Sequence, residues 1–291
     1  MTDGLDLDHV AVVVRDLDVA EANFTRLGFR LTRRSSHEGP VPPEGTIGPW
    51  GTGNHCAMFR QGYLELLGIT DPDLYHAHLV RRLARHEGLH LIAFGTGDAV
   101  AAVENLRPRG VAIADPADVG RAVPFGMGTR PGRFGIANLD PDVYPEADFI
   151  VIEQKTRDVL WQPDLMAHPN GAVSLESVTV ATPDPDGLIA RLTPILGAPS
   201  GGTFALDPGR LHVLDSQGFA RAYPGCRPPG DLPCAVAVAI GVESLTATEA
   251  CLRANGVDIE ARGAGLIRVG AETGCGAVVD FVEISGKEKG R

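Results

Sequence analysis

Three side chains in the first half of the 291-residue chain are of types that carry out acid–base or metal chemistry. His9 lies in the apolar run LDHVAVVV, and Glu65 and Glu153 lie in the apolar runs YLELL and FIVIEQ. An unpaired carboxylate inside an apolar strand is costly, so each glutamate needs an ionic partner, a metal ion or water. Carboxylates and imidazoles move protons, and together they suit divalent transition metals.

The elements that carry these residues belong to an internal repeat. Residues 7–14 form an apolar, β-branched run that predicts a strand, and an amphipathic helix ending at a glycine is predicted over Asp18–Leu27. The same order returns three times, with strands that begin at Leu89, Leu175 and Ala235. Strand-like runs separated by Gly-rich turns follow each helix, so each unit is βαβββ. The sequence predicts an α+β protein of four βαβββ modules, paired into two curled-sheet domains.

Domain limits follow from the linker between the second and third copies. The segment LMAHPNG joins these copies, so we expect an N-terminal domain at residues 1–170 and a C-terminal domain at residues 171–291.

In a curled sheet, side chains alternate between a concave cup and a convex face covered by helices. His9 is expected to face the cup, because Val10, Val12 and Val14 are the bulky set that packs under the helix.

Composition limits the classes of function. The net charge of −11 argues against nucleic acid or an anionic membrane as a partner, and no apolar stretch is long enough to span a bilayer. The N-terminus MTDGLDLD lacks the features of a secretory signal, and the five cysteines form no CxxC pair. We expect a cytoplasmic protein with reduced thiols that acts on a small-molecule substrate.

Several motifs resemble those of one known superfamily. LDHVAVVVRDLD, YLELLG, GLHLIAF and FIVIEQ look like the vicinal oxygen chelate superfamily, which includes glyoxalase I, methylmalonyl-CoA epimerase, extradiol dioxygenases and metal-free antibiotic-binding proteins. WGTGNH and WQPDLMAHPNGA are more narrowly similar to bacterial glyoxalase-like proteins. The resemblance covers residues 5 to about 172, whereas the C-terminal half matches by module pattern alone. It implies paired modules around a metal-binding cup, and it allows a homodimer.

The resemblance also implies a set of metal ligands in the N-terminal cup, which would take Mn, Fe, Co, Ni or Zn. The four ligand positions fall on His9, Glu65, Glu153 and residues 90–91. Because 19 residues separate His9 from Gly28 and Leu91 from Gly110, His9 aligns with Leu91. His90 then becomes a ligand only if a bulge turns it inward. Three other histidines are alternative donors: His37, His55 and His168.

A metal-dependent lyase or isomerase is the leading function that the resemblance implies. The metal would act as a Lewis acid on a small oxygen-rich metabolite, with Glu65 or Glu153 as the base. The second hypothesis is a metal-free protein that sequesters a small molecule. The third is an extradiol-type dioxygenase, which needs two histidines and one carboxylate. The C-terminal domain is expected to hold no metal, since few donors occupy its equivalent positions. These are Ser177, His212, Ala237 and Glu283.

Five further residues are expected to contact the substrate. Asn54 and His55 follow a Gly-containing turn beside the strand of Glu65. Arg130 lies in a Gly-rich segment, where a guanidinium can clamp a carboxylate or phosphate. Trp161 and His168 lie where the chain passes to the second domain, and they are expected to close the cup. Each of these positions also has a purely structural interpretation, as a turn, a solvated arginine or core packing.

Overall fold

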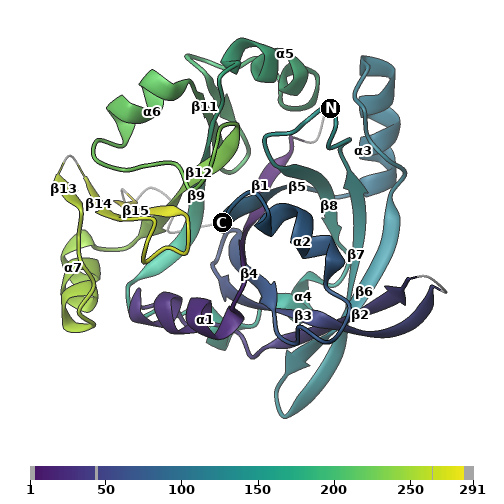
Figure 1. Cartoon of the computed structure of the whole chain (residues 1–291), viewed down its shortest axis with the longest axis horizontal. Helices are drawn as coiled ribbons and strands as arrows, with labels where there is room; N and C mark the ends of the chain where they lie inside the picture. Colours follow the sequence, from purple (N-terminus) through teal and green to yellow (C-terminus); the bar gives the residue numbers. More distant parts are fainter. Residues whose placement is uncertain (1–3, 43–44, 264, 285–291) are drawn as a thin grey trace.

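The computed structural model describes residues 4–42, 45–263 and 265–284 of the chain (Figure 1). Over these residues the chain forms a mixed α+β structure with two curled sheets, one of them nearly closed into a barrel. The predicted fold class is therefore confirmed. None of the described helices is both long and apolar enough to cross a membrane.

In the described part of the chain, the N-terminal sheet has eight strands in the order β2-β3-β4-β1-β5-β8-β7-β6. Its central strands β1 (Asp6–Val14) and β5 (Gly88–Thr96) run antiparallel. Each has a parallel partner on its other side, β4 (Tyr63–Ile69) or β8 (Asp148–Gln154). The outer strands are β2 (Ser35–Val41), β3 (Thr46–Met58), β6 (Ala117–Phe125) and β7 (Gly128–Asn138). Two βαβββ copies thus meet at the β1–β5 pair.

Helices α1 (Leu17–Arg26) and α3 (Ala99–Leu106) cover the convex face of this sheet. Each begins after an aspartate, Asp16 or Asp98, whose side chain accepts hydrogen bonds from two backbone N–H groups. Each helix buries one apolar stripe against the sheet, as amphipathic helices do. The remaining short elements of this half are α2 (Ala77–Leu83), α4 (Arg157–Leu160) and the 3-10 turns η1 (Arg107–Arg109) and η2 (Pro163–Leu165).

The C-terminal sheet repeats the arrangement with seven described strands in the order β10-β11-β9-β12-β15-β14-β13. These strands are β9 (Ala172–Ala181), β10 (Thr203–Ala205), β11 (Arg210–Leu214), β12 (Cys234–Val242), β13 (Ala261–Gly263), β14 (Leu266–Val269) and β15 (Val278–Glu283). Its helices are α5 (Pro185–Leu196), α6 (Ser216–Ala222) and α7 (Leu245–Ala254). The third module has two strands after its helix, where the other modules have three.

Helix α6 fills the concave side of the C-terminal sheet. Phe219 and Tyr223 pack into a buried cluster with Ala237. The Tyr223 hydroxyl is hydrogen bonded to Thr179 at 2.8 Å, and the guanidinium of Arg268 lies 4.2 Å from the centre of the Tyr223 ring. Protein side chains therefore occupy this second cup.

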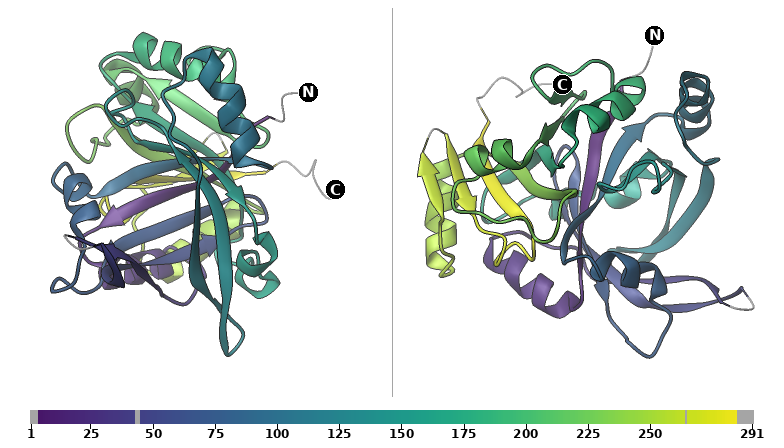
Figure 2. Two further views of the ribbon diagram at one scale, coloured as in Figure 1. Left: turned by 90° about the vertical axis from the view of Figure 1, so that its right-hand side faces the viewer. Right: turned by 45° about the horizontal axis from the view of Figure 1, so that its top comes forward.

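The two halves of the molecule lie side by side (Figure 2), and one hydrophobic core is shared between them. The Phe29 ring from the first half stacks on the Phe281 ring from the second, with 5.9 Å between the centroids. The halves also exchange backbone hydrogen bonds, such as the one that Leu7 N–H donates to Pro208 O at 2.9 Å. This shared core holds the N-terminal sheet from its convex side and leaves its concave side free for a site.

Substitutions at two glycines that follow helices, Gly28 and Gly110, measure how closely the two halves approach each other. Gly28 has a φ of +84°, and a Cβ there would lie 2.6 Å from Cys251 Sγ and 2.9 Å from Asn170 Cβ. Gly110 has a φ of +81° with nothing within 4 Å of such a Cβ. We expect Gly110→Ala to cost about 1 kcal/mol from backbone strain, and Gly28→Ala at least about 2 kcal/mol because the neighbouring half must shift. Urea unfolding measures both losses, and equal losses would contradict the close approach.

Candidate functional site

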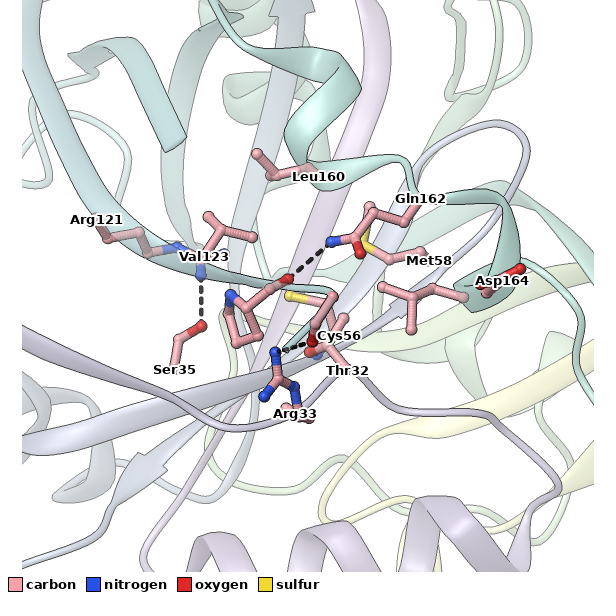
Figure 3. A pocket seen from close by; sticks show the side chains of 13 residues that line it. Thr32, Arg33, Ser35, Cys56, Met58, Arg121, Val123, Leu160, Gln162 and Asp164 are labelled. Carbon is pink, nitrogen blue, oxygen red and sulfur yellow. Dashed lines mark hydrogen bonds between the residues drawn. The ribbon is translucent and has the colours of Figure 1, made fainter. Parts of the chain in front are cut away.

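The concave face of the N-terminal sheet forms a cup lined mainly by apolar side chains. These are Cys56, Met58, Tyr63, Ala93, Val123, Phe134, Ile150, Ile152, Val159 and Leu160. The segment after β8 closes one side of the cup, where Trp161 meets the Tyr63 ring edge-on at 5.6 Å. A cavity of about 190 Å³ opens beside this cluster, bounded by β3, β6 and the α4–η2 segment (Figure 3). The cup, with its cavity, is the candidate site.

His9 faces this cup, as the alternation along its strand predicts. Its imidazole is only 3% exposed and stacks on the Tyr63 ring, with 4.3 Å between the centroids and 12° between the planes. The Nδ1–H donates to Asp8 Oδ1 at 2.6 Å, and the same oxygen accepts a bond from Gln154 Nε2 at 2.8 Å. Asp8 reaches this position because it is skipped in the pairing of β1 with β5. The carboxylate and the stacked ring together hold the imidazole in one orientation.

Glu65 faces the same cup, two residues beyond Tyr63 on β4, which corresponds to about 6.6 Å along the strand. Its carboxylate accepts a hydrogen bond from the side-chain amide of Asn54. His37 lies on the same side, with Nδ1 3.0 Å from Thr52 Oγ1. Burial lowers the pKa of His37, and the negative charge of Glu65 partly offsets this effect. A side-chain amide is thus the partner of this half-buried carboxylate in the described structure.

Glu153 lies on the opposite face of β8. Ile152 belongs to the cup cluster, whereas Val151 belongs to the main core under the helices, so Glu153 points to the helix layer. Its Oε2 accepts a hydrogen bond from the backbone N–H of Ala99 at 3.3 Å, at the start of α3. Gln154 takes the cup-facing position instead. The structure therefore does not bring Glu153 together with His9 and Glu65.

At the fourth expected ligand position, Leu91 packs against the cup cluster. His90 is indeed skipped in the strand pairing, because Ala11 pairs with Leu91 and Val12 pairs with Leu89. However, its Nε2–H donates to the backbone oxygen of His86 at 3.0 Å, and the two imidazoles stack at 4.1 Å. The bulge exists, but the ring is held by the loop before β5.

Of the five expected substrate contacts, Asn54 and Trp161 lie at the cup and three residues lie elsewhere. His55 is on the other face of β3, where its Nδ1–H donates to Thr32 O at 2.8 Å. Arg130 is exposed near the tip of the β6–β7 hairpin, with its guanidinium 3.9 Å from the centre of the Phe125 ring. Strand alternation explains the position of His55, which is one residue out of phase with Asn54.

His168 has a structural position in the linker between the two halves. Its Nδ1 accepts a hydrogen bond from Arg30 N–H at 2.9 Å, and its Nε2–H donates to Met58 O at 2.8 Å. The ring also lies edge-on against Phe29 and Phe59. Burial lowers the pKa of His168, which favours the neutral form that this pair of bonds requires. Both ring nitrogens are thus used to fasten the linker to the N-terminal half.

Two lining residues, Arg121 and Ser35, were not expected from the sequence. They come from opposite edges of the N-terminal sheet, and Arg121 Nη1 donates to Ser35 Oγ at 2.7 Å (Figure 3). The bond joins β6 to β2 where the curled sheet nearly closes. The sequence signal for Arg121 is the run DVGRAVPF. In a strand, Arg121 and Val123 are two residues apart and so lie on the same face.

The paired modules and the cup define a protein of the vicinal oxygen chelate type. A family model described as a glyoxalase-like domain matches residues 7–196, or 190 of the 291 residues. The chain belongs to this glyoxalase-like family. No curated protein matches the sequence.

Solved structures with similar folds include a hypothetical protein from Staphylococcus aureus. It is 13% identical, with a TM-score of 0.60 over 96% of this chain and 99% of its own. A mutant of 4-hydroxymandelate synthase from Streptomyces coelicolor is 11% identical, with a TM-score of 0.60 over 96% of this chain and 92% of its own. Methylmalonyl-CoA epimerase from the same organism is 23% identical over 53% of this chain and 99% of its own, but its TM-score of 0.34 supports no argument. The likeness at these identities concerns the fold alone.

The donors that face the cup do not fit a resident metal ion. Of the four expected ligand positions, only those of His9 and Glu65 direct a donor towards it, since Leu91 has no donor atom and Glu153 lies under α3. His37, one of the alternative donors, lies on the same side with its Nδ1 3.0 Å from Thr52 Oγ1. Among the described residues, no three His, Cys, Asp or Glu side chains gather in a metal-binding arrangement. A structural or catalytic site needs at least three such protein ligands in most cases.

Two histidines beside the sheet, the half-buried His78 and the buried His90, predict how stability depends on pH. Burial lowers the pKa of His78 and of His90 to about 4 from the ordinary value of 6.5. Between these values the unfolded chain binds more protons, so the free energy of unfolding falls as the pH drops from 6.5 towards 4. Each histidine contributes at most about 1.4 kcal/mol per pH unit. Asp6 opposes this trend between pH 3.8 and 6, because burial raises its pKa to about 6.

Urea unfolding at several values between about pH 4.5 and 7.5 measures this slope. His90→Gln removes one of the titrating groups and keeps a polar side chain, so its stability should depend less steeply on pH than that of the wild type. The same slope in both proteins would show that His90 is protonated as easily in the folded chain as in the unfolded one.

Proposed function

We propose that this glyoxalase-like protein binds a small molecule in its N-terminal cup without a resident metal. The observation that supports this most is the donor set, in which only two of the four expected ligand positions direct a donor into the cup. The cup also has the lining typical of ligand sites, a largely apolar wall with a few oriented polar groups.

The aromatic rings on one side of the cup form a rigid support next to the cavity, and Tyr63 among them is only 4% exposed. Tyr63 is held between His9 and Trp161, and the guanidinium of Arg157 covers the Trp161 ring at 3.6 Å. His9 is fixed in turn by Asp8. Because Tyr63 pairs with the cavity-lining Met58 across β4 and β3, these ordered rings fix the wall of the cavity, and a ligand there loses little further side-chain entropy on the protein side.

A metal-dependent lyase or isomerase is the second candidate. The observation in its favour is that His9 and Glu65 face the same cup from adjacent strands. The extradiol-type dioxygenase has less support, because it needs a second histidine and Leu91 stands at that position.

A cytoplasmic location and a homodimer stay predictions. The five cysteines are free thiols, which is consistent with a reducing compartment.

Metal analysis of the purified protein separates the first two candidates. After incubation with Mn, Fe, Co, Ni or Zn and removal of the excess, we expect far less than one metal ion per chain, with no change in the His9→Ala variant. One bound metal ion per wild-type chain, lost in His9→Ala and in Glu65→Gln, would overturn the proposal and support the lyase or isomerase.

Filling the cavity tests the position of the ligand. Met58 lines the cavity, whereas Met127 is fully exposed at the tip of the β6–β7 hairpin. We expect Met58→Phe to weaken the binding of small aromatic compounds at least about tenfold, because the larger ring occupies their space. Met127→Phe is the matched control and should leave binding unchanged. Ligand-observed NMR in the presence of a chelator measures both, and full binding by a folded Met58→Phe protein would place the ligand elsewhere.

A further inference from the structure

The cavity of the cup has a charge opposite to that of the whole protein. Two guanidinium groups line it, from Arg33 and Arg121, against one carboxylate, from Asp164. The side chains that line the cavity therefore carry +1, with Glu65 of the same cup outside this lining, whereas the chain carries −11. Figure 3 shows Arg121 and Ser35 on one side of the cavity and Asp164 on the other. A local positive charge in an acidic protein suggests selection for an anion.

Arg121 is the cation placed best for a ligand. It is half-buried, and one of its nitrogens is bonded to Ser35 Oγ. Its guanidinium lies 6.0 Å from the centre of the Phe134 ring. Among the ion pairs of the described residues, none includes Arg121 or Arg33. The guanidinium also lies near the Cys56 thiol, where its charge opposes the rise in pKa that burial causes, and its remaining donors are available for an anion beside the apolar wall.

Arg33 closes the other side of the opening. Its Nη2 donates to the backbone oxygens of Gly126 and Gly128 at 2.9 and 3.0 Å. These bonds fasten the tip of the β6–β7 hairpin beside the cavity, and Gln162 Nε2 fastens it again through Pro124 O at 2.8 Å. Arg33 is thus partly used by the fold, and Arg121 keeps more of its donors available.

The size and the wall of the cavity limit what accompanies the anionic group. Apolar groups of Cys56, Met58, Val123, Leu160 and Leu165 line it. An apolar cavity of about 150 Å³ holds benzene. The cavity of about 190 Å³ therefore has room for a benzene-sized body and one small polar group. It is well below the roughly 300–1,000 Å³ of sites for drug-sized ligands.

We propose that this cavity binds a small aromatic or aliphatic monocarboxylate. The carboxylate accepts hydrogen bonds from Arg121, beside Ser35, and the hydrocarbon body packs against the wall of Met58 and Leu160. A monoanion matches the lining charge of +1, and a carboxylate matches the planar fork of a guanidinium. This inference rests on the proposed function, since it names the class of ligand for the same cup.

Benzoate and its neutral isostere benzamide test the charge requirement directly. By calorimetry at low salt with a chelator present, we expect the wild type to bind benzoate at least about tenfold more tightly than benzamide, because a charge-assisted bond replaces a neutral one. The Arg121→Met variant should bind benzoate only as tightly as benzamide, and its affinity for benzamide should equal that of the wild type. Arg81→Met is the matched control. Its side chain is 75% exposed on α2, and both affinities should stay as in the wild type.

Each other outcome overturns the inference in a recognisable way. Equal binding of the two compounds by the wild type would leave a small-molecule cup without anion selectivity. No binding of either compound at millimolar concentration would remove monocarboxylates of this size as ligands. An equal loss of affinity for both compounds in Arg121→Met would show that the arginine acts only by joining β6 to β2. Benzoate binding that disappears with chelator and returns with metal would instead contradict the proposed metal-independent function.

Discussion

Side-chain alternation along the strands of the N-terminal sheet is the constraint on which the site depends. The strand period is two, so a shift of one residue moves a functional group from the cup to the helix layer. On β3 this places Asn54 beside Glu65 and sends His55 to the opposite face. On β8 it gives the cup an amide, from Gln154, and gives the carboxylate of Glu153 to the start of α3. The chemistry of the cup is therefore decided by phase as much as by residue type.

The duplicated architecture gives two cups with different contents. In the C-terminal half, α6 places Phe219 and Tyr223 over the sheet, and a buried pair between Arg268 and Asp280 at 2.7 Å satisfies the polar groups there. In the N-terminal half, the corresponding space is bounded by Trp161 and keeps a cavity. The two halves thus share one core, and the cavity beside the cup lies in the N-terminal half.

Electrostatics at the cup is local, and it differs from that of the molecule as a whole. An acidic protein repels anions at long range, but salt screens this repulsion over about 8 Å at physiological ionic strength. At the cavity itself, the charged lining consists of Arg33 and Arg121 against Asp164. The overall charge therefore affects how fast a ligand arrives, while the lining decides which ligand stays.

The sequence by itself determined the repeated modules, the fold class and the orientation of His9, because these depend on local periodicity and on alternation within a single strand. It predicted the same place in the cup for Glu65 and Glu153, and only Glu65 faces it. The tertiary structure alone decided what else joins His9 and Glu65. The bulges at Asp8 and His90 arise from pairing between β1 and β5, and Arg121 reaches the cavity because the sheet curls until β6 approaches β2. Such features depend on contacts between distant segments, and no periodicity within one strand carries that information.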